Sequence, residues 1–342
     1  MVKLNHYLKI SKFVKNFILP IGSNTLIKKI VFNKKKNFAI LCYHRIVEEG
    51  YFYNNISPLS GLCVSKKKFY SQVKFLKENF ELVSLDQLHD HILNKKNNFV
   101  VSLTFDDGYK DNLTNALPIL EKLEVPFSIF VVTRFLEGDT FMWWYELWDI
   151  INKSEFILFD KKKHNLDSSA SKINTFFFLT KILINLDLES QKILLKELRA
   201  SNYNINYNDL CLDWNDIQFL SSHNLVTIGN HTHSHLRLIN LNENDLFNEI
   251  AESKNILEKK LKYPIKYIAY PFGGVEDISN ANLLFTKKIN YKLGLSTQKN
   301  NFMEKNLLNL PRYNVDNEIS NPALAGKING FEDFLLNIKN FF

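Results

Sequence analysis

Apolar residues recur along the chain in short β-branched runs, separated by longer stretches with helical spacing. The runs predict strands at 99–105, 126–132, 225–229, 266–270, 289–295 and 307–311. Between them, the spacing predicts amphipathic helices over 65–80, 111–123 and 242–261. Strands without polar alternation are typical of a parallel sheet that is buried on both faces. The pattern therefore predicts an α/β fold in which strands and helices alternate.

The alternation stops over residues 137–213. Residues 173–200 have the spacing of one or two helices, and the polar residues between 161 and 171 are typical of surface connectors. We interpret 137–213 as a helical insertion that partly roofs the functional site.

Two adjacent carboxylates and a glycine end one predicted strand. Asp106 and Asp107 follow the apolar run 99–105 directly, at the strand end where α/β sheets and barrels place their chemistry. Successive residues that leave a strand point in different directions, so one carboxylate is suited to bind a cation and the other to handle a proton. A solvated turn is the alternative, unless other residues supply metal ligands.

Histidines follow another apolar run. His231 and His235 come directly after residues 225–229, and if the chain turns into a helix there, their side chains lie one turn apart on one face. Two imidazoles and one carboxylate make a three-ligand site for a divalent ion and leave a position open for water. One of the two adjacent carboxylates would complete it.

These two motifs resemble those of a known family. Thr104–Tyr109 followed by Asn230–His235 is similar to the first two motifs of the polysaccharide deacetylases, the NodB-homology fold of carbohydrate esterase family four. The resemblance extends from about residue 37 to about residue 315 and implies a distorted (β/α) barrel. It also implies that Asp106 is the general base, and that Asp107, His231 and His235 hold the metal.

The third motif departs from the usual family pattern. Residues 268–274 fill its place, with Ala269 where an arginine is expected, and resemble a branch with a Tyr-Pro-Phe-Gly form that includes the poly-N-acetylglucosamine deacetylases. In that branch the general-acid histidine lies on the N-terminal side. His44, at the end of the strand-like run 38–43, is therefore the predicted acid, with an ordinary strand-end histidine as the alternative. Arg312 is a candidate substitute for the missing arginine.

The resemblance implies substrate contacts as well. The backbone N–H of Phe272 is the implied donor to the oxyanion. The predicted substrate-binding residues are Tyr270, Pro271, Arg312, Trp143 and Trp144. The two tryptophans are suited to stack on sugar rings, although core packing is the commoner role of tryptophan.

The positive charge is concentrated in a leader. The net charge is +7, but residues 1–36 contain nine lysines and no acidic residue, so the other 306 residues carry 34 basic and 36 acidic side chains. This distribution argues against nucleic-acid binding. The leader lacks the features of a signal peptide or a membrane span, which leaves a helix packed on the domain 37–342 or an interfacial helix on anionic lipid. We expect a cytoplasmic protein, consistent with three cysteines in no paired spacing.

The predicted reaction is metal-dependent removal of an N-acetyl group from an N-acetylhexosamine unit of a polysaccharide or a lipid-linked glycan precursor. Zinc suits the ligand set, and cobalt, nickel or iron are admissible. Two alternatives stay open: a deacylase of another amide or of an O-acetyl ester, and a glycan-binding protein that retains the metal without catalysis.

Overall fold

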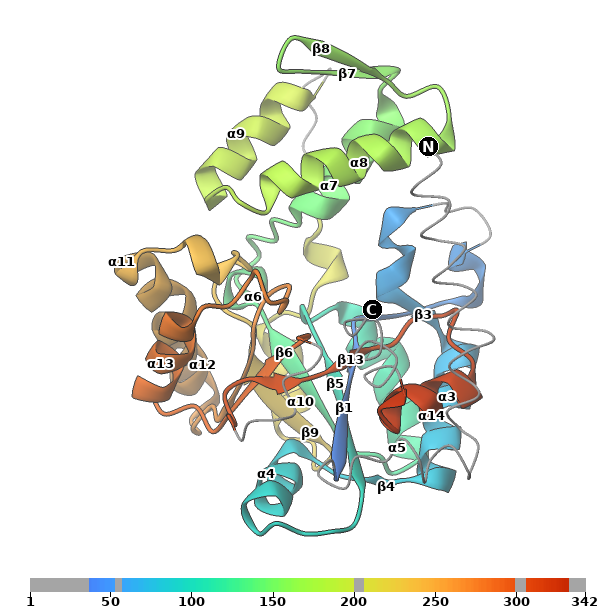
Figure 1. Cartoon of the computed structure of the whole chain (residues 1–342), viewed down its shortest axis with the longest axis vertical. Coiled ribbons are helices and arrows are strands. Elements are labelled where there is room, and N and C mark those ends of the chain that lie inside the picture. The colour runs from blue at the N-terminus through green and yellow to red at the C-terminus, as the bar shows by residue number, and fades with distance from the viewer. Residues whose placement is uncertain (1–36, 53–56, 200–205, 299–305, 332–342) are drawn as a thin grey trace, which may run out of the picture.

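A sheet of parallel strands forms the centre of the protein. The computed structural model describes residues 37–52, 57–199, 206–298 and 306–331. Its main sheet has the order β12, β11, β10, β9, β6, β5, β1, β13 (Figure 1). These strands are β1 (Phe38–Tyr43), β5 (Val100–Phe105), β6 (Phe127–Val131), β9 (Val226–Asn230), β10 (Tyr267–Ala269), β11 (Leu293–Ser296), β12 (Leu310–Pro311) and β13 (Tyr313–Asn314), and β4 (Glu81–Leu82) pairs with the start of β5.

The two ends of this sheet meet in one short segment. β12 pairs with β11, and β13 pairs with β1, yet only Arg312 separates β12 from β13. The segment therefore changes neighbours at Arg312 and nearly closes the sheet into a ring. The predicted distorted (β/α) barrel is confirmed. The strands β10 to β12 are shorter than the apolar runs suggested. For β11, residues 289–292 form a turn after the helix that ends at Lys288.

Helices cover the outside of the barrel. They are α3 (Lys66–Asn79), α4 (Leu85–Leu93), α5 (Leu117–Lys122), α6 (Thr133–Leu136), α10 (Trp214–Ser221), α11 (Glu243–Leu246), α12 (Ser253–Leu261), α13 (Asn280–Lys288) and α14 (Asn321–Ile328). Serine caps begin several of them: Ser84 and Ser279 form capping boxes at α4 and α13, which satisfy backbone N–H groups that lack helical partners. The predicted helix 242–261 is continuous, with a π-helical segment at Phe247–Glu252 between α11 and α12.

The core lies on both sides of the strands. Every residue of β1 and of β5 is buried, as their uninterrupted apolar runs predicted. A second apolar cluster fills the insertion, around Trp143, Trp144 and Leu179. The insertion thus has a core of its own, beside that of the barrel.

The insertion contains a hairpin as well as helices. It comprises α7 (Trp143–Lys153), β7 (Phe156–Phe159), β8 (Lys162–Asn165), α8 (Ser169–Leu183) and α9 (Leu188–Leu198), and lies above the barrel in Figure 1. The prediction that residues 161–164 are a connector was wrong, since residues 162–164 belong to β8 and Lys161 lies in the turn before it. Asp160 and Lys161 have φ of 49° and 60°, the left-handed geometry of a tight hairpin turn. Polar residues on the exposed strand of a hairpin resemble a loop in sequence.

The leader 1–36 lies outside the described residues, as do residues 332–342. Within the residues that are described, no helix has the length and apolar character needed to cross a membrane. The remaining short elements are the pair β2 (Arg45–Val47) and β3 (Cys63–Ser65), the π-helical segment Asn112–Ala116 before α5, and the 3₁₀ turns Glu49–Phe52, Pro58–Leu62, Asn208–Leu210 and Leu238–Asn240.

Replacement of Gly294 by alanine is expected to destabilise the barrel. A Cβ there would lie 2.5 Å from the backbone oxygen of Leu308 and 2.5 Å from the hydroxyl of Tyr270, which donates a hydrogen bond to that oxygen. Gly294→Ala should lower the free energy of unfolding by about 1–3 kcal/mol, measured by urea titration. Gly61→Ala is the control, because nothing lies within 4 Å of its Cβ position. Equal stability of the two variants would contradict this account.

Candidate active site

A cavity of about 300 Å³ lies where the barrel strands end. Residues from the ends of β1, β5, β9, β10, β11 and β12–β13 line it, and α7 and α8 of the insertion contribute Trp143, Trp144, Phe176 and Thr180. The C-terminal ends of parallel strands meet at one rim of a barrel, so residues far apart in sequence converge there. The volume is at the lower end of the range for small-molecule sites.

The two carboxylates at the end of β5 reach this cavity in different directions. Asp107 and Gly108 both have left-handed backbone conformations, with φ of 71° and 68°. This tight bend separates Asp107 from Asp106, although both side chains are buried and line the cavity. A Cβ on residue 108 would also lie 3.2 Å from Val131, so glycine suits the position sterically as well.

Asp106 forms a buried bidentate ion pair with Arg312. Nη1 and Nη2 of Arg312 donate to Oδ1 and Oδ2 of Asp106, each at 2.6 Å. Burial by itself would raise the pKa of Asp106, but the adjacent guanidinium lowers it to about 2. The carboxylate is therefore ionised at neutral pH. Arg312 was also among the predicted substrate contacts, but its terminal nitrogens are engaged with Asp106.

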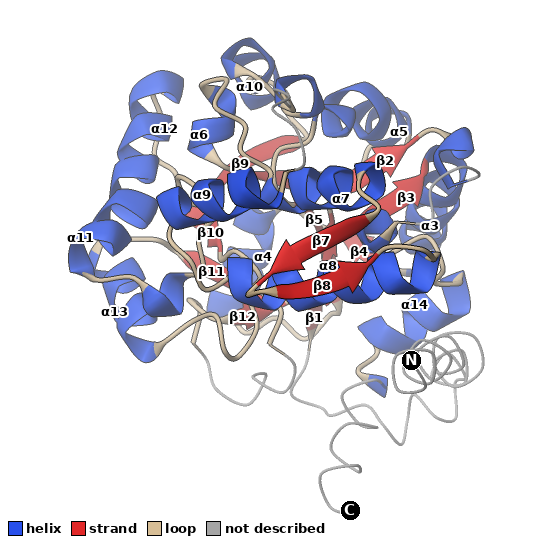
Figure 2. Ribbon diagram, turned by 90° about the horizontal axis from the view of Figure 1, so that it is seen from above, coloured by secondary structure: helices blue, strands red, loops and turns tan. Residues whose placement is uncertain are grey.

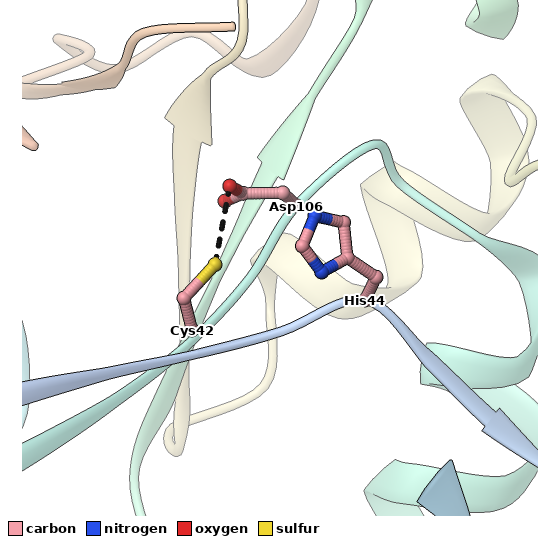
Figure 3. Close-up of side chains that lie close together, drawn as sticks. All are labelled: Cys42, His44 and Asp106. Atoms are coloured by element: carbon pink, nitrogen blue, oxygen red, sulfur yellow. Dashed lines mark hydrogen bonds between the residues drawn. The ribbon is translucent and has the colours of Figure 1, made fainter. Parts of the chain in front are cut away.

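The thiol of Cys42 is a further neighbour of Asp106. Its Sγ donates to Oδ2 at 3.4 Å, and Figure 3 shows Cys42, His44 and Asp106 grouped together at the ends of β1 and β5. Burial raises the pKa of Cys42 well above its usual value, so the sulfur keeps its proton as the donor. Nothing in the sequence marks Cys42 as a site residue, because a cysteine inside an apolar strand has the pattern of a core residue.

Asp107 faces both histidines. Its Oδ1 lies 3.3 Å from Nε2 of His231 and 3.4 Å from Nε2 of His235. This buried oxygen has no hydrogen-bond partner among the described residues. Two ligands held at about 2.0–2.1 Å by a tetrahedral metal are about 3.3 Å apart, so the separations fit a shared divalent ion.

Hydrogen bonding also prepares His231 as a ligand. Its Nδ1 lies 2.8 Å from the carbonyl oxygen of Ala269, which can only accept, so Nδ1 carries the proton and Nε2 presents its lone pair toward Asp107. Burial by itself would raise the pKa of Asp107, but the two imidazoles hold it well below its usual value. The donor set fits a zinc-like ion.

The prediction that His231 and His235 lie on one helix was wrong. Residues 231–237 form an irregular loop, in which Thr232 and His235 have φ of 69° and 59°. The imidazoles nevertheless converge, because the loop folds back on itself: the N–H of His235 donates to Oγ1 of Thr232, and the N–H of Thr232 donates to Oδ1 of Asn230.

A buried glutamate supports this loop. Oε2 of Glu249 accepts the N–H groups of His233 and Ser234, at 3.1 and 2.9 Å. Glu249 lies in the π-helical segment of the helix 243–261 and is only 4 % exposed. The sequence analysis missed it. The sequence does carry a signal for a buried glutamate: Glu249 follows Leu246 by three positions, which puts an acidic residue on the apolar face of the predicted helix.

His44 and Phe272 border the same cavity. His44 follows β1, and its backbone oxygen accepts a hydrogen bond from the Asn112 side chain at 2.7 Å. Burial lowers the pKa of its imidazole despite the two nearby carboxylates. Phe272 has φ of 61°, and no acceptor for its N–H is found in the part of the chain that the structure describes. Its backbone oxygen accepts a bond from Thr297, which anchors the turn.

The other predicted substrate contacts have mainly packing roles in the structure. Trp143 and Trp144 line the cavity but are only 4 % and 6 % exposed, and Trp144 lies against the ring of His235 with centroids 5.0 Å apart. This burial favours core packing over an open stacking platform. Tyr270 lines the cavity while its hydroxyl donates to Leu308, and Pro271 is buried and is not among the lining residues.

Comparison with known proteins agrees with this geometry. The polysaccharide deacetylase family profile matches residues 94–155 and 168–293, more than half of the chain. The chain belongs to the polysaccharide deacetylase family. It is 24 % identical over 276 residues to a poly-beta-1,6-N-acetyl-D-glucosamine N-deacetylase of Staphylococcus aureus, covering 78 % of this chain and 74 % of that relative.

Solved structures share the fold. The Streptococcus pyogenes deacetylase PplD, in complex with acetate, is 21 % identical, with a TM-score of 0.53 over 85 % of this chain and 97 % of that one. IcaB from Ammonifex degensii is 17 % identical, with a TM-score of 0.54 over 85 % and 96 % of the two chains.

The family match contains some parts of the site and not others. It includes Asp106, Asp107, His231 and His235. It excludes His44, Arg312 and residues 156–167, the segment of the β7–β8 hairpin. His44 and Arg312 are therefore assigned to the site by their positions at the cavity in the structure and not by the family match.

Removal of the Arg312 charge should destabilise the protein in a pH-dependent way. In the wild type the lowered pKa of Asp106 contributes stability above about pH 3.8, its ordinary value, and that stability is lost as the pH falls toward about 2. Arg312→Met leaves a buried, unpaired carboxylate and should cost about 3–5 kcal/mol at neutral pH. Because burial then raises the pKa of Asp106, the cost should shrink as acid protonates it.

Urea unfolding of the wild type and of Arg312→Met, at neutral pH and in mildly acidic buffer, measures this effect. Arg312→Lys is the control, since it keeps the charge and loses the bidentate geometry. A loss of stability that is the same at both pH values would mean that Arg312 contributes only packing.

Proposed function

We propose that this protein removes the N-acetyl group from an N-acetylhexosamine unit of a glycan, by metal-dependent hydrolysis. The observation that carries the proposal is the pair of adjacent carboxylates with separate partners. Asp107 lies within 3.4 Å of two imidazole nitrogens, and Asp106 is held by a guanidinium. One carboxylate is thus available to bind a cation and the other to act as a base, and metal-dependent amide hydrolysis needs both side by side.

Asp107, His231 and His235 would hold the metal. When bound, a divalent ion supplies Lewis acidity toward the acetyl carbonyl and lowers the pKa of a coordinated water. Zinc suits two imidazoles and a carboxylate, and cobalt, nickel or iron are chemically compatible.

Asp106 is the proposed base. Arg312 and Cys42 both donate to its oxygens, which fixes the carboxylate toward the cavity and keeps it ionised at neutral pH. It accepts the proton of the attacking water as the new C–O bond forms. The N–H of Phe272 is a suitable donor to the oxyanion that develops on the acetyl carbonyl.

His44 is the proposed acid. An amine cannot leave as an anion at neutral pH, so breakage of the C–N bond requires a proton on nitrogen. Ligand atoms of His44 and Asp106 lie within 4.8 Å of each other. Because burial keeps the resting imidazole neutral, His44 takes up the proton that Asp106 removed from the water and passes it to the leaving nitrogen, yielding acetate and a free amine.

A glycan substrate is supported by the named relative, a poly-beta-1,6-N-acetyl-D-glucosamine N-deacetylase. We propose a lipid-linked precursor at the inner membrane face, because the nine lysines of residues 1–36 suit anionic lipid and the expected location is cytoplasmic. Fractionation tests this location: recovery of all the protein in a membrane-free fraction at physiological salt would contradict it.

Two matched aspartate variants are expected to separate the base from the metal ligand. Asp106→Asn should keep stoichiometric metal and lose acetate release by at least about 100-fold. Asp107→Asn should lose both the metal and the activity, because an amide is a poor ligand for zinc-like ions. The assay measures acetate from N-acetylglucosamine oligomers and lipid-linked saccharides, using metal-stripped protein with and without added divalent ion.

The outcomes separate the remaining alternatives. Acetate release only from O-acetylated sugars would indicate an esterase. Bound metal and glycan affinity without release from any substrate would indicate a binding protein. Full activity of Asp106→Asn would rule out its role as the base.

A further inference from the structure

Exposed apolar side chains are concentrated on the insertion. Eleven large apolar residues are exposed in the described part of the chain, and five of them lie between residues 156 and 193: Phe156, Leu158, Phe177, Phe178 and Ile193. Figure 1 shows the β7–β8 hairpin at the end of the molecule farthest from the barrel, and Figure 2 looks down on it. Single exposed apolar residues are normal, but a concentration of this kind marks an interaction surface.

The hairpin is apolar on both of its faces. Ile157 is buried in the core of the insertion, and Phe159 packs against the same cluster. Side chains alternate along a strand, so Phe156 and Leu158 point to the opposite, outer face, where they are 45 % and 63 % exposed. The inner face explains how the hairpin is held, whereas the outer face lacks a covering element within the described residues.

Lysines accompany the apolar residues of the outer face. Lys163 pairs directly with Leu158, which places both on that face, and its Nζ lies 4.3 Å from the ring centroid of Phe156. Lys161 and Lys162 are also exposed. The hairpin from 156 to 165 carries three lysines against one aspartate, whereas the chain after residue 36 is nearly neutral.

Helix α8 packs beneath the hairpin. The ring of Phe178 stacks on His164 of β8 with centroids 5.1 Å apart, and His164 pairs directly with Ile157, so this contact lies on the inner face. The outer face is therefore made by residues of the hairpin. We call this set the hairpin surface: Phe156, Leu158 and Lys163.

We propose that the hairpin surface docks on a lipid bilayer that contains anionic headgroups. Phenylalanine and leucine side chains can bury at the headgroup boundary while neighbouring lysines extend to the phosphates, which is the composition of an interfacial anchor. The positive charge is complementary to such a bilayer. This inference concerns where the protein binds and does not depend on its chemistry.

Docking would also place the cavity near the lipid. The helix α8, which packs against the inner face of the hairpin through Phe178, supplies Phe176 and Thr180 to the cavity wall. A bilayer on the hairpin surface would therefore lie on the side of the molecule where the insertion borders the cavity. The arrangement therefore favours substrates attached to a membrane over soluble ones.

Vesicle sedimentation of the full-length protein tests the proposal. The vesicles contain phosphatidylcholine alone or phosphatidylcholine with phosphatidylglycerol. The wild type should sediment with the anionic vesicles, and the double variant Phe156→Asp/Leu158→Asp should lose at least about tenfold in apparent affinity. Phe219→Asp on α10 is the matched control, because Phe219 is a similarly exposed aromatic residue outside the insertion.

Three measurements make the result decisive. Lys163→Glu should weaken binding to anionic vesicles, and added salt should do the same. Acetate release from a soluble substrate should be unchanged in the double variant, which separates docking from catalysis. The proposal would be overturned if the wild type failed to sediment or bound neutral vesicles equally well. It would also be overturned if the double variant bound like the wild type, which would assign the contact to another surface or to residues 1–36.

Discussion

The bidentate contact between Arg312 and Asp106 connects the closure of the barrel to the chemistry of the site. Arg312 lies at the point where the last strand segment leaves β11 and joins β1. Its backbone N–H donates to Ser296 of β11, while its guanidinium pairs with Asp106 at the end of β5. A buried ion pair is stabilising only when its geometry is good, because two charges have lost their hydration. The barrel supplies that geometry, so the charge state of Asp106 depends on correct closure.

The sequence predicts the architecture well, because burial on both faces leaves a clear pattern. The runs at β1, β5, β6 and β9 contain few polar residues, and a residue of the site directly follows β1, β5 and β9. The later strands are short, with three residues in β10 and two each in β12 and β13. Such segments carry too little periodicity for their bounds to be predicted.

The site is predictable in its residue types and not in its local geometry. Asp107, His235 and Phe272 all have left-handed backbone conformations that non-glycine residues seldom adopt. Nothing in their identities signals this, since the tertiary structure imposes it. The loop of His231 and His235 shows the consequence: helical spacing paired the two histidines, whereas the structure brings them together at Asp107 through an irregular loop.

Buried polar groups explain how that strained loop is maintained. A left-handed residue costs of the order of 1 kcal/mol or more, and it persists only where the surroundings fix it. Here Asn230 and Glu249 accept the loop's backbone N–H groups, and Asn230 in turn donates to Ser253 and Tyr291. Each of these groups would be costly to bury alone, and together they are satisfied. The imidazoles therefore point at Asp107 because a helix on the outside of the barrel supplies the matching acceptor, which makes the packing of that helix part of the candidate metal site.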